Sequence, residues 1–171
     1  MGKVRHQAAG VDIVIREEFC GAATSRICYP GISTCAAITG VGPKGLIGTH
    51  ITVGTDDELV SEIFAALIAL GAAQCPVFCV TGALTQFKVL TQAPTLNTRK
   101  KIGKKIRAEL SEKSVVRFFD TTKIGAVHIM AAKNGMDASF SWVKEVGNAV
   151  KGYTYPDFAG TPIPAADFVV R

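Results

Sequence analysis

Long hydrophobic runs are missing from this sequence, although its mean hydropathy is positive. No uninterrupted apolar stretch reaches the length of a membrane span, so the sequence predicts a protein in solution. The first residues lack the apolar core of a secretory signal. We therefore expect the protein to act in the cytoplasm or, after export by a non-classical route, in a reducing host cytosol. With 171 residues, we expect one domain over residues 1–171.

Cysteine occurs in an odd number and at irregular spacings, which argues against a framework of disulfides and favours a reducing compartment. The five cysteines are Cys20, Cys28, Cys35, Cys75 and Cys79. Histidine is also sparse, and His6 and His128 stand too far from other ligands to give the spacing of a metal site. We expect neither a metal nor a cofactor.

The net charge of +5 is moderate, but six of the nineteen Lys and Arg residues fall within residues 99–107. Apolar residues Ile102, Ile106 and Leu110 recur every four positions there, which predicts an amphipathic helix from residue 97 or 98 to about residue 111. No aromatic residues interleave the charges, which argues against nucleic acid as a partner. We expect an acidic protein partner to contact the basic face at Arg99, Lys100, Lys104 and Lys105.

The remaining patterns predict several strands and a second helix. Runs typical of strands occur at residues 11–16, 24–29, 76–80, 115–119, 126–130 and 138–142, with a shorter run at 87–90. A capping box of Thr55 and Glu58 opens an apolar helical stretch that ends at Gly71. Residues 1–10 are expected to form a loose arm and residues 151–171 an irregular tail. This order predicts an α/β sandwich of mixed or antiparallel sheets with two main helices.

Residues 29–54 are the most informative stretch, because two β-forming runs flank a Gly/Pro cluster in the pattern of an antiparallel hairpin. With the turn centred between Gly42 and Pro43, Cys35 lies opposite His50. Directly opposed side chains have Cβ atoms about 4.5–5.5 Å apart, so a thiol and an imidazole can meet there. An imidazole can take the proton of a thiol, which makes Cys35 a candidate nucleophile and His50 its base.

A structural role for each of these side chains stays open. A cysteine in an Ala-rich strand is usually a small buried hydrophobe, and a histidine in a strand is usually a hydrogen-bonded framework residue. We expect that framework role for His128. On the other side of the hairpin Ile38 faces Ile47, and this apolar side is expected to pack against the helix at residues 55–71.

Residues 32–35, which end in Cys35, together with His50 after Gly48 and Thr49, resemble bacterial Cys–His glutamine deamidases. This group includes the catalytic domain of cytotoxic necrotizing factor, related lethal toxins and the chemoreceptor deamidase of chemotaxis systems. The resemblance extends loosely through the later helices and strands. It implies a deamidase-like fold and hydrolysis of a glutamine side chain on a protein substrate, by a toxin-like effector or a resident chemotaxis enzyme.

The resemblance also implies roles for neighbouring residues. The group uses a Thr or a backbone carbonyl to orient its histidine, at a position that Tyr29 occupies here. Gly or Ser commonly precedes the nucleophile, whereas Thr34 stands here, and amides around Ser33 and Thr34 would form the oxyanion hole. A transglutaminase, a cysteine amidase acting on other amides, and a non-enzymatic binding module with a basic face are the alternatives. We expect a monomer.

Overall fold

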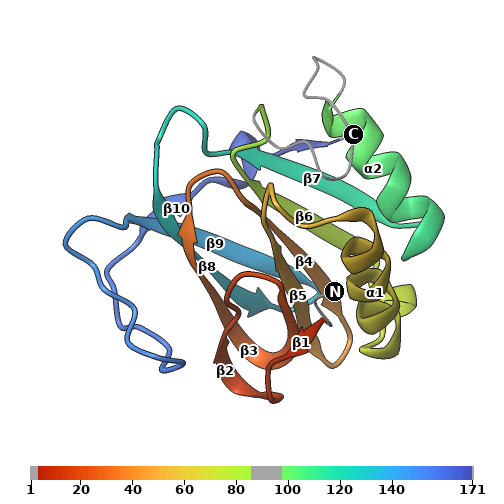
Figure 1. The fold of residues 1–171 in the computed structure, drawn as a ribbon, viewed down its shortest axis with the longest axis horizontal. Coiled ribbons are helices and arrows are strands. Elements are labelled where there is room, and N and C mark those ends of the chain that lie inside the picture. The colour runs from red at the N-terminus through yellow and green to blue at the C-terminus, as the bar shows by residue number, and fades with distance from the viewer. Residues whose placement is uncertain (1–3, 86–97, 171) are drawn as a thin grey trace.

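One curled sheet with two helices on one side makes up the computed structural model, which describes residues 4–85 and 98–170 (Figure 1). Along the chain its helices and strands are β1 (Arg5–His6), β2 (Gly10–Val14), β3 (Phe19–Ile32), β4 (Ala36–Gly42), β5 (Gly45–Ile51), α1 (Asp57–Ala69), β6 (Val77–Gly82), α2 (Thr98–Glu109), β7 (Val115–Asp120), β8 (Val127–Asn134), β9 (Asp137–Lys144), β10 (Thr161–Ile163) and β11 (Val169–Val170). Two short 3-10 helices lie at Ala72–Gln74 and Ala165–Asp167.

The strand order is β10-β9-β8-β3-β5-β4-β6-β7-β11, with β1 and β2 also paired to β3. Strands β1 and β2 run parallel to β3, and β6 runs parallel to β7, while the other pairs are antiparallel. The predicted α/β class and mixed pairing are therefore confirmed. The prediction of separate sheets is wrong, since all strands belong to one sheet. The 14-residue β3 joins its two halves, because it pairs with β5 near its start and with β8 near its end.

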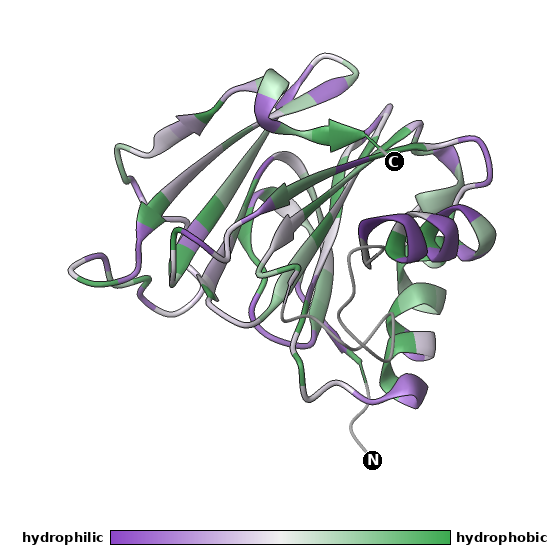
Figure 2. Ribbon diagram, turned by 90° about the horizontal axis from the view of Figure 1, so that it is seen from above, coloured by the Kyte–Doolittle hydropathy of each residue, from purple (hydrophilic) through white to green (hydrophobic). Residues whose placement is uncertain are grey.

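The two helices cover one face of the sheet and enclose the larger core. In Figure 2 α1 is mostly apolar, whereas α2 is mostly hydrophilic. Ile38 and Ile47 of the hairpin pack in this core with Ile63 of α1 and Ile102 of α2. The predicted packing of the hairpin's apolar side against the first helix is confirmed, and each such buried side chain contributes about 1.5–3 kcal/mol to folding.

A second core fills the inside of the curl, on the other face of the hairpin. It contains Tyr29 of β3, Val41 of β4, Ile129 of β8 and the side chain of Cys35. All five cysteines are free thiols, and all are buried. The curl therefore brings the candidate nucleophile into a packed interior between strands that are far apart in sequence.

Helix α1 begins one residue later than the capping box predicts. Asp56 is the N-cap, and its carboxylate accepts a hydrogen bond from the Leu59 amide at 2.8 Å. The Thr55 hydroxyl does not cap the helix, because it accepts a hydrogen bond from the Thr52 amide at 3.1 Å. The predicted end is close, because Gly71 follows the helix with a φ of +102°. Such a left-handed residue stops a helix and favours glycine.

Both ends of the chain are more regular than predicted. Arg5–His6 pairs with β3 in place of part of the loose arm, and β10 and β11 pair with β9 and β7 in place of part of the irregular tail. The predicted run at residues 87–90 and a helix start at Asn97 lie outside the described residues. Within the described parts of the chain, neither helix has the length and apolar character needed to cross a membrane.

Candidate functional site

The hairpin of β4 and β5 has a register two residues away from the predicted one. Ala37 faces His50, so the turn is centred between Pro43 and Lys44. The turn takes this position because the fixed φ of Pro43 suits the first central residue of a tight turn. An even shift keeps each side chain on its predicted face. Cys35, which directly precedes β4, therefore shares a face with His50 but lies diagonally across from it.

Three side chains from three segments meet at this end of the sheet. A carboxylate oxygen of Glu17, the sulfur of Cys35 and a ring nitrogen of His50 all lie within 4.8 Å of one another. The Cys35 thiol faces Oε1 of Glu17 at 4.0 Å. Cys35 is 3% exposed and His50 is 0% exposed, whereas Glu17 is exposed. The cluster therefore reaches solvent on the side of Glu17.

The imidazole of His50 is held in one orientation and one tautomer. Its Nδ1 donates to the carbonyl oxygen of Ile15 at 3.3 Å, which leaves the lone pair on Nε2. Nε2 is buried and has no hydrogen-bond partner among the described residues. Burial lowers the pKa of His50 to about 4, so the ring is neutral at neutral pH. A fixed, neutral imidazole with a free lone pair is suited to accept a proton or to bind a cation.

A tight turn between β2 and β3 places Glu17 over the thiol. The Phe19 amide donates to the Arg16 carbonyl at 3.0 Å, and the Glu18 amide donates to the His50 carbonyl at 2.7 Å. Glu18 has a φ of +65°, which costs a non-glycine residue about 1–3 kcal/mol. The hydrogen bond to His50 helps to hold this conformation. Nothing in the local sequence indicated the turn, and sequence reasoning missed Glu17.

The backbone of Cys35 is fixed from the opposite side by the end of β6. Its carbonyl oxygen accepts a hydrogen bond from the Ala83 amide at 3.1 Å. A Cβ atom on Gly82 would lie 2.3 Å from that same oxygen, so only glycine fits there without a backbone shift. The end of β6 therefore holds the backbone of Cys35 in place.

Opposing influences act on the thiol of Cys35. Burial raises its pKa most, and the negative charge of Glu17 raises it further. The hydroxyl and amide of Thr34 and the amide of Ser33 lower it, because they donate hydrogen bonds toward the sulfur. The net pKa is raised, so the resting thiol is protonated at neutral pH. Ser33 and Thr34 are both exposed.

The other cysteines lack this combination. Burial raises the pKa of Cys20 and Cys75 to about 11, and that of Cys28 and Cys79 to about 12. Cys20 does form a second thiol–imidazole pair, with its sulfur 3.7 Å from Nδ1 of His6. Cys20 belongs to the larger core whereas His6 is exposed, and the pair was not identified from the sequence. It provides a natural internal control for Cys35 and His50.

Tyr29 is not the group that orients His50. Its hydroxyl bonds to Oγ1 of Thr39 at 2.7 Å and donates to the carbonyl of Ile38 at 3.4 Å. The ring fills the space above Gly48, where a Cβ atom would lie 2.0 Å from the hydroxyl oxygen. The orienting contact predicted for Tyr29 comes instead from the carbonyl of Ile15.

His128 has the framework role expected of it. Its Nδ1 accepts a hydrogen bond from the Gly31 amide at 2.9 Å, and Nε2 donates to the Asn148 carbonyl at 2.5 Å. The ring also stacks on Phe158, with centroids 5.9 Å apart. Both nitrogens are occupied, so His128 has no free lone pair for chemistry.

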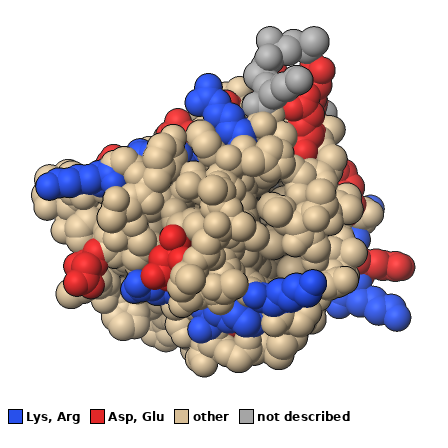
Figure 3. All heavy atoms as spheres, turned by 90° about the horizontal axis from the view of Figure 1, so that it is seen from below, with Lys and Arg blue, Asp and Glu red and all other residues tan. Residues whose placement is uncertain are grey.

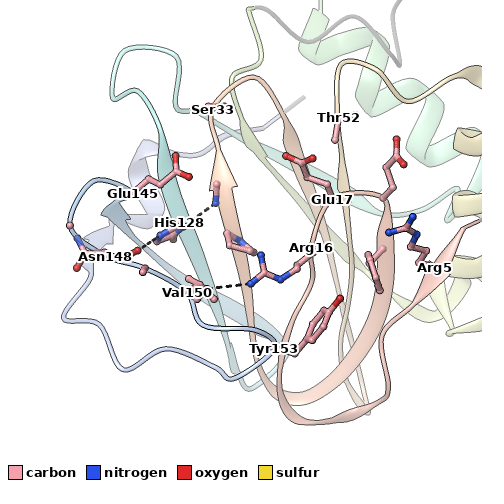
Figure 4. A pocket seen from close by; sticks show the side chains of 16 residues that line it. Arg5, Arg16, Glu17, Ser33, Thr52, His128, Glu145, Asn148, Val150 and Tyr153 are labelled. Atoms are coloured by element: carbon pink, nitrogen blue, oxygen red, sulfur yellow. Dashed lines mark hydrogen bonds between the residues drawn. The ribbon is translucent and has the colours of Figure 1, made fainter. Parts of the chain in front are cut away.

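A cavity of about 1090 Å³ lies beside the cluster. Its wall includes Glu17, Ser33, Thr52, His128 and Tyr153. Figure 4 shows Glu17 between Ser33 and Thr52, with His128 on the far side of the opening. The cavity therefore opens toward the exposed side of the cluster, where Glu17 lies.

The basic residues of α2 are partly engaged within the chain. Arg99 lies 3.7 Å from Asp120, and Lys105 lies 2.6 Å from Glu109. Lys100 and Lys104 are exposed. On the face shown in Figure 3, basic and acidic side chains are interspersed over a mostly uncharged surface. Ion pairs within the chain thus neutralise part of the positive charge that was predicted to contact an acidic partner.

Comparison with protein-family models, with curated proteins and with solved structures gives no match for this chain.

Proposed function

We propose that this protein hydrolyses the carboxamide of a glutamine side chain on a protein substrate, with Cys35 as nucleophile and His50 as base. The observation that carries the proposal is the position of the Cys35 sulfur within 4.8 Å of a ring nitrogen of His50, an imidazole whose Nδ1 is fixed by the Ile15 carbonyl. A nucleophile, a base within reach and a group that orients the base are the parts such catalysis requires. The resemblance to Cys–His glutamine deamidases supports the same reaction.

The first half of the reaction starts from a neutral pair. Burial keeps the Cys35 thiol protonated and the His50 imidazole unprotonated at neutral pH. The thiol proton therefore passes to Nε2 of His50 as the sulfur attacks the carboxamide carbon. The C–N bond then breaks, and His50 returns the proton to the departing nitrogen, which leaves as ammonia. A thioester on Cys35 remains.

The second half restores the enzyme. His50 removes a proton from water, whose oxygen attacks the thioester carbon and displaces the sulfur. Cys35 recovers its proton from His50, and glutamate is released. If an amine takes the place of water, the same thioester yields a transglutaminase product.

The oxyanion of each tetrahedral intermediate needs donors close to the sulfur. The amides of Ser33 and Thr34 already lower the pKa of the Cys35 thiol, so they are oriented toward negative charge at that place. Fixed donors of this kind act where charge develops in the transition state. Ser33 also belongs to the cavity wall, so the same loop borders the approach for substrate.

Substrate access depends on Glu17. The Cys35 side chain is 3% exposed, and the exposed Glu17 side chain stands on its solvent side. A glutamine carboxamide can reach the sulfur once Glu17 swings toward the cavity. A long, exposed side chain makes such a movement at little cost, because it does not disturb the packed core.

Ammonia release from a panel of glutamine-containing peptides, with mass spectrometry to detect conversion of amide to acid, tests the proposal. We expect Cys35→Ser to abolish release and His50→Gln to lower the rate by about 10²–10⁴-fold. Cys20→Ser, which removes the thiol of the other cysteine–histidine pair, should retain the rate. Undiminished turnover in Cys35→Ser or His50→Gln would eliminate the proposed roles. An amine-dependent product in place of the acid would identify a transglutaminase.

A further inference from the structure

We propose that Glu17, Cys35 and His50 together form a Zn²⁺ site. Their donor atoms, a carboxylate oxygen, a sulfur and a ring nitrogen, all lie within 4.8 Å of one another. The three residues come from the turn before β3, the loop before β4 and the end of β5. The hairpin brings Cys35 and His50 together, as its sequence predicts, but nothing in the sequence indicates that Glu17 joins them.

The donor atoms lie within 4.8 Å of one another, so they must move inward by up to about 1 Å to close around a small ion. Zinc binds sulfur at about 2.3 Å and histidine nitrogen or carboxylate oxygen at about 2.0–2.2 Å, so its ligand atoms stand roughly 3.3–3.8 Å apart in a tetrahedron. The sulfur of Cys35 is 4.0 Å from Oε1 of Glu17, slightly beyond that range. Rotation of the exposed Glu17 side chain can bring its oxygen inward. Because Glu17 is exposed, a water molecule can take the fourth position from its side.

The buried imidazole points independently to a cation. Nε2 of His50 is wholly buried and has no hydrogen-bond partner among the residues that the structure describes. Nδ1 donates to the carbonyl of Ile15. Metal-binding histidines typically make this second contact, which fixes the ring and presents the other nitrogen to the ion.

The proposed hydrolysis gives the carboxylate of Glu17 no chemical role at the sulfur. A carboxylate 4.0 Å from the sulfur opposes formation of a thiolate, since the two negative charges repel. A bound cation removes that conflict, because both anionic groups then become its ligands. The mixed set of thiolate, imidazole and carboxylate favours zinc over magnesium or calcium, which prefer oxygen ligands.

Zinc binding and nucleophilic attack by Cys35 exclude each other. When the ion binds, the thiol proton leaves to solvent and the sulfur lone pair is donated to the metal. The zinc-bound protein is then inactive as a thiol hydrolase. The site itself does not depend on the proposed function, since the ligands bind zinc whether or not the protein hydrolyses amides.

Titration of the chelator-treated protein with Zn²⁺ against a chromophoric competitor tests the site. We expect one ion per chain, and a loss of affinity of at least about 10-fold in Cys35→Ser, His50→Gln and Glu17→Gln, comparable with the loss of a supporting group at other metal sites. Co²⁺ should give a thiolate-to-metal charge-transfer absorption that Cys35→Ser lacks. The matched controls Cys20→Ser and Glu18→Gln should bind as the unchanged protein does.

Two measurements keep the test decisive if a buried variant fails to fold. Glu17→Gln changes an exposed side chain, and Zn²⁺ should protect Cys35 of the unchanged protein from alkylation. No binding by the unchanged protein, equal affinity in Glu17→Gln, or loss of the ion in Cys20→Ser would overturn the zinc site. Ammonia release measured separately in the presence of chelator reports on the hydrolase proposal alone.

Discussion

Acidification should destabilise this protein through His50. Burial lowers the pKa of that imidazole from 6.5 to about 4. Between these values the unfolded chain binds a proton at His50 that the folded chain does not, so stability falls as the pH falls. The two pKa values differ by about 2.5, which at about 1.4 kcal/mol per pH unit corresponds to about 3 kcal/mol. This contribution is fully present above about pH 6.5 and is lost at about pH 4.

Denaturant unfolding at a series of pH values from 7 to 4, with chelator present, measures this effect. The free energy of unfolding is about 5–15 kcal/mol for most domains, so a change of about 3 kcal/mol is readily resolved. The matched variant is His50→Gln, which keeps a polar side chain but cannot titrate. Between pH 7 and pH 4 the free energy of unfolding of this variant should fall by about 3 kcal/mol less than that of the unchanged protein. His6 and His128 remain in both proteins, so their contributions cancel in the comparison.

Parallel pH dependence of the unchanged protein and His50→Gln would refute the reasoning. It would mean that His50 has the same pKa in the folded and unfolded chains, so that burial does not hold the ring neutral.

Three further substitutions test the surroundings of the site. Glu17→Gln should accelerate alkylation of Cys35 by iodoacetamide near neutral pH, because removing the negative charge lowers the thiol pKa; a slower or unchanged rate would contradict that electrostatic effect. Gly82→Ala should lower the free energy of unfolding by about 1–3 kcal/mol, because the added Cβ would lie 2.3 Å from the Cys35 carbonyl oxygen. An unchanged melting temperature would contradict this close contact between Gly82 and Cys35. Asp56→Ala should lower the free energy of unfolding, measured with denaturant, by about 1 kcal/mol, because α1 loses its N-cap. An unchanged free energy of unfolding would show that Asp56 is not the effective cap.

The faces of the hairpin could be predicted from sequence, but its register could not. Alternation of side chains assigns Cys35 and His50 to one face and Ile38 to the other, and an error of two residues leaves that assignment intact. The exact pairing depends on which residues form the turn. Proline at residue 43 decides this, because it takes the first central position.

The length of β3 and the position of Glu17 had no local signal. Gly21 and its small neighbours have little β propensity, yet they lie in β3. A Cβ atom on Gly21 would lie 3.0 Å from Cβ of Gln7, so small residues are needed where the N-terminal strands pack close. The turn that carries Glu17 is held beside β5 by the hydrogen bond from the Glu18 amide to the His50 carbonyl, a long-range contact that periodicity does not reveal.

The ends of the chain were predicted less well for a related reason. Strands of two or three residues, such as β1, β10 and β11, are too short to show a period of two. They are strands because neighbouring edges offer them backbone partners. Helices α1 and α2, each of 12 residues or more, carry several turns of apolar repeat and were predicted to within a few residues.

Mapping which thiol reacts first with iodoacetamide most directly tests whether His50 activates Cys35. The reagent carries a small carboxamide, and mass spectrometry of the chelator-treated protein at neutral pH identifies each modified cysteine. We expect Cys35 to react ahead of Cys28 and Cys79, and its rate to fall by at least about 10-fold in His50→Gln. A Cys35 that reacts no faster than those buried thiols, or at the same rate without His50, would contradict the account.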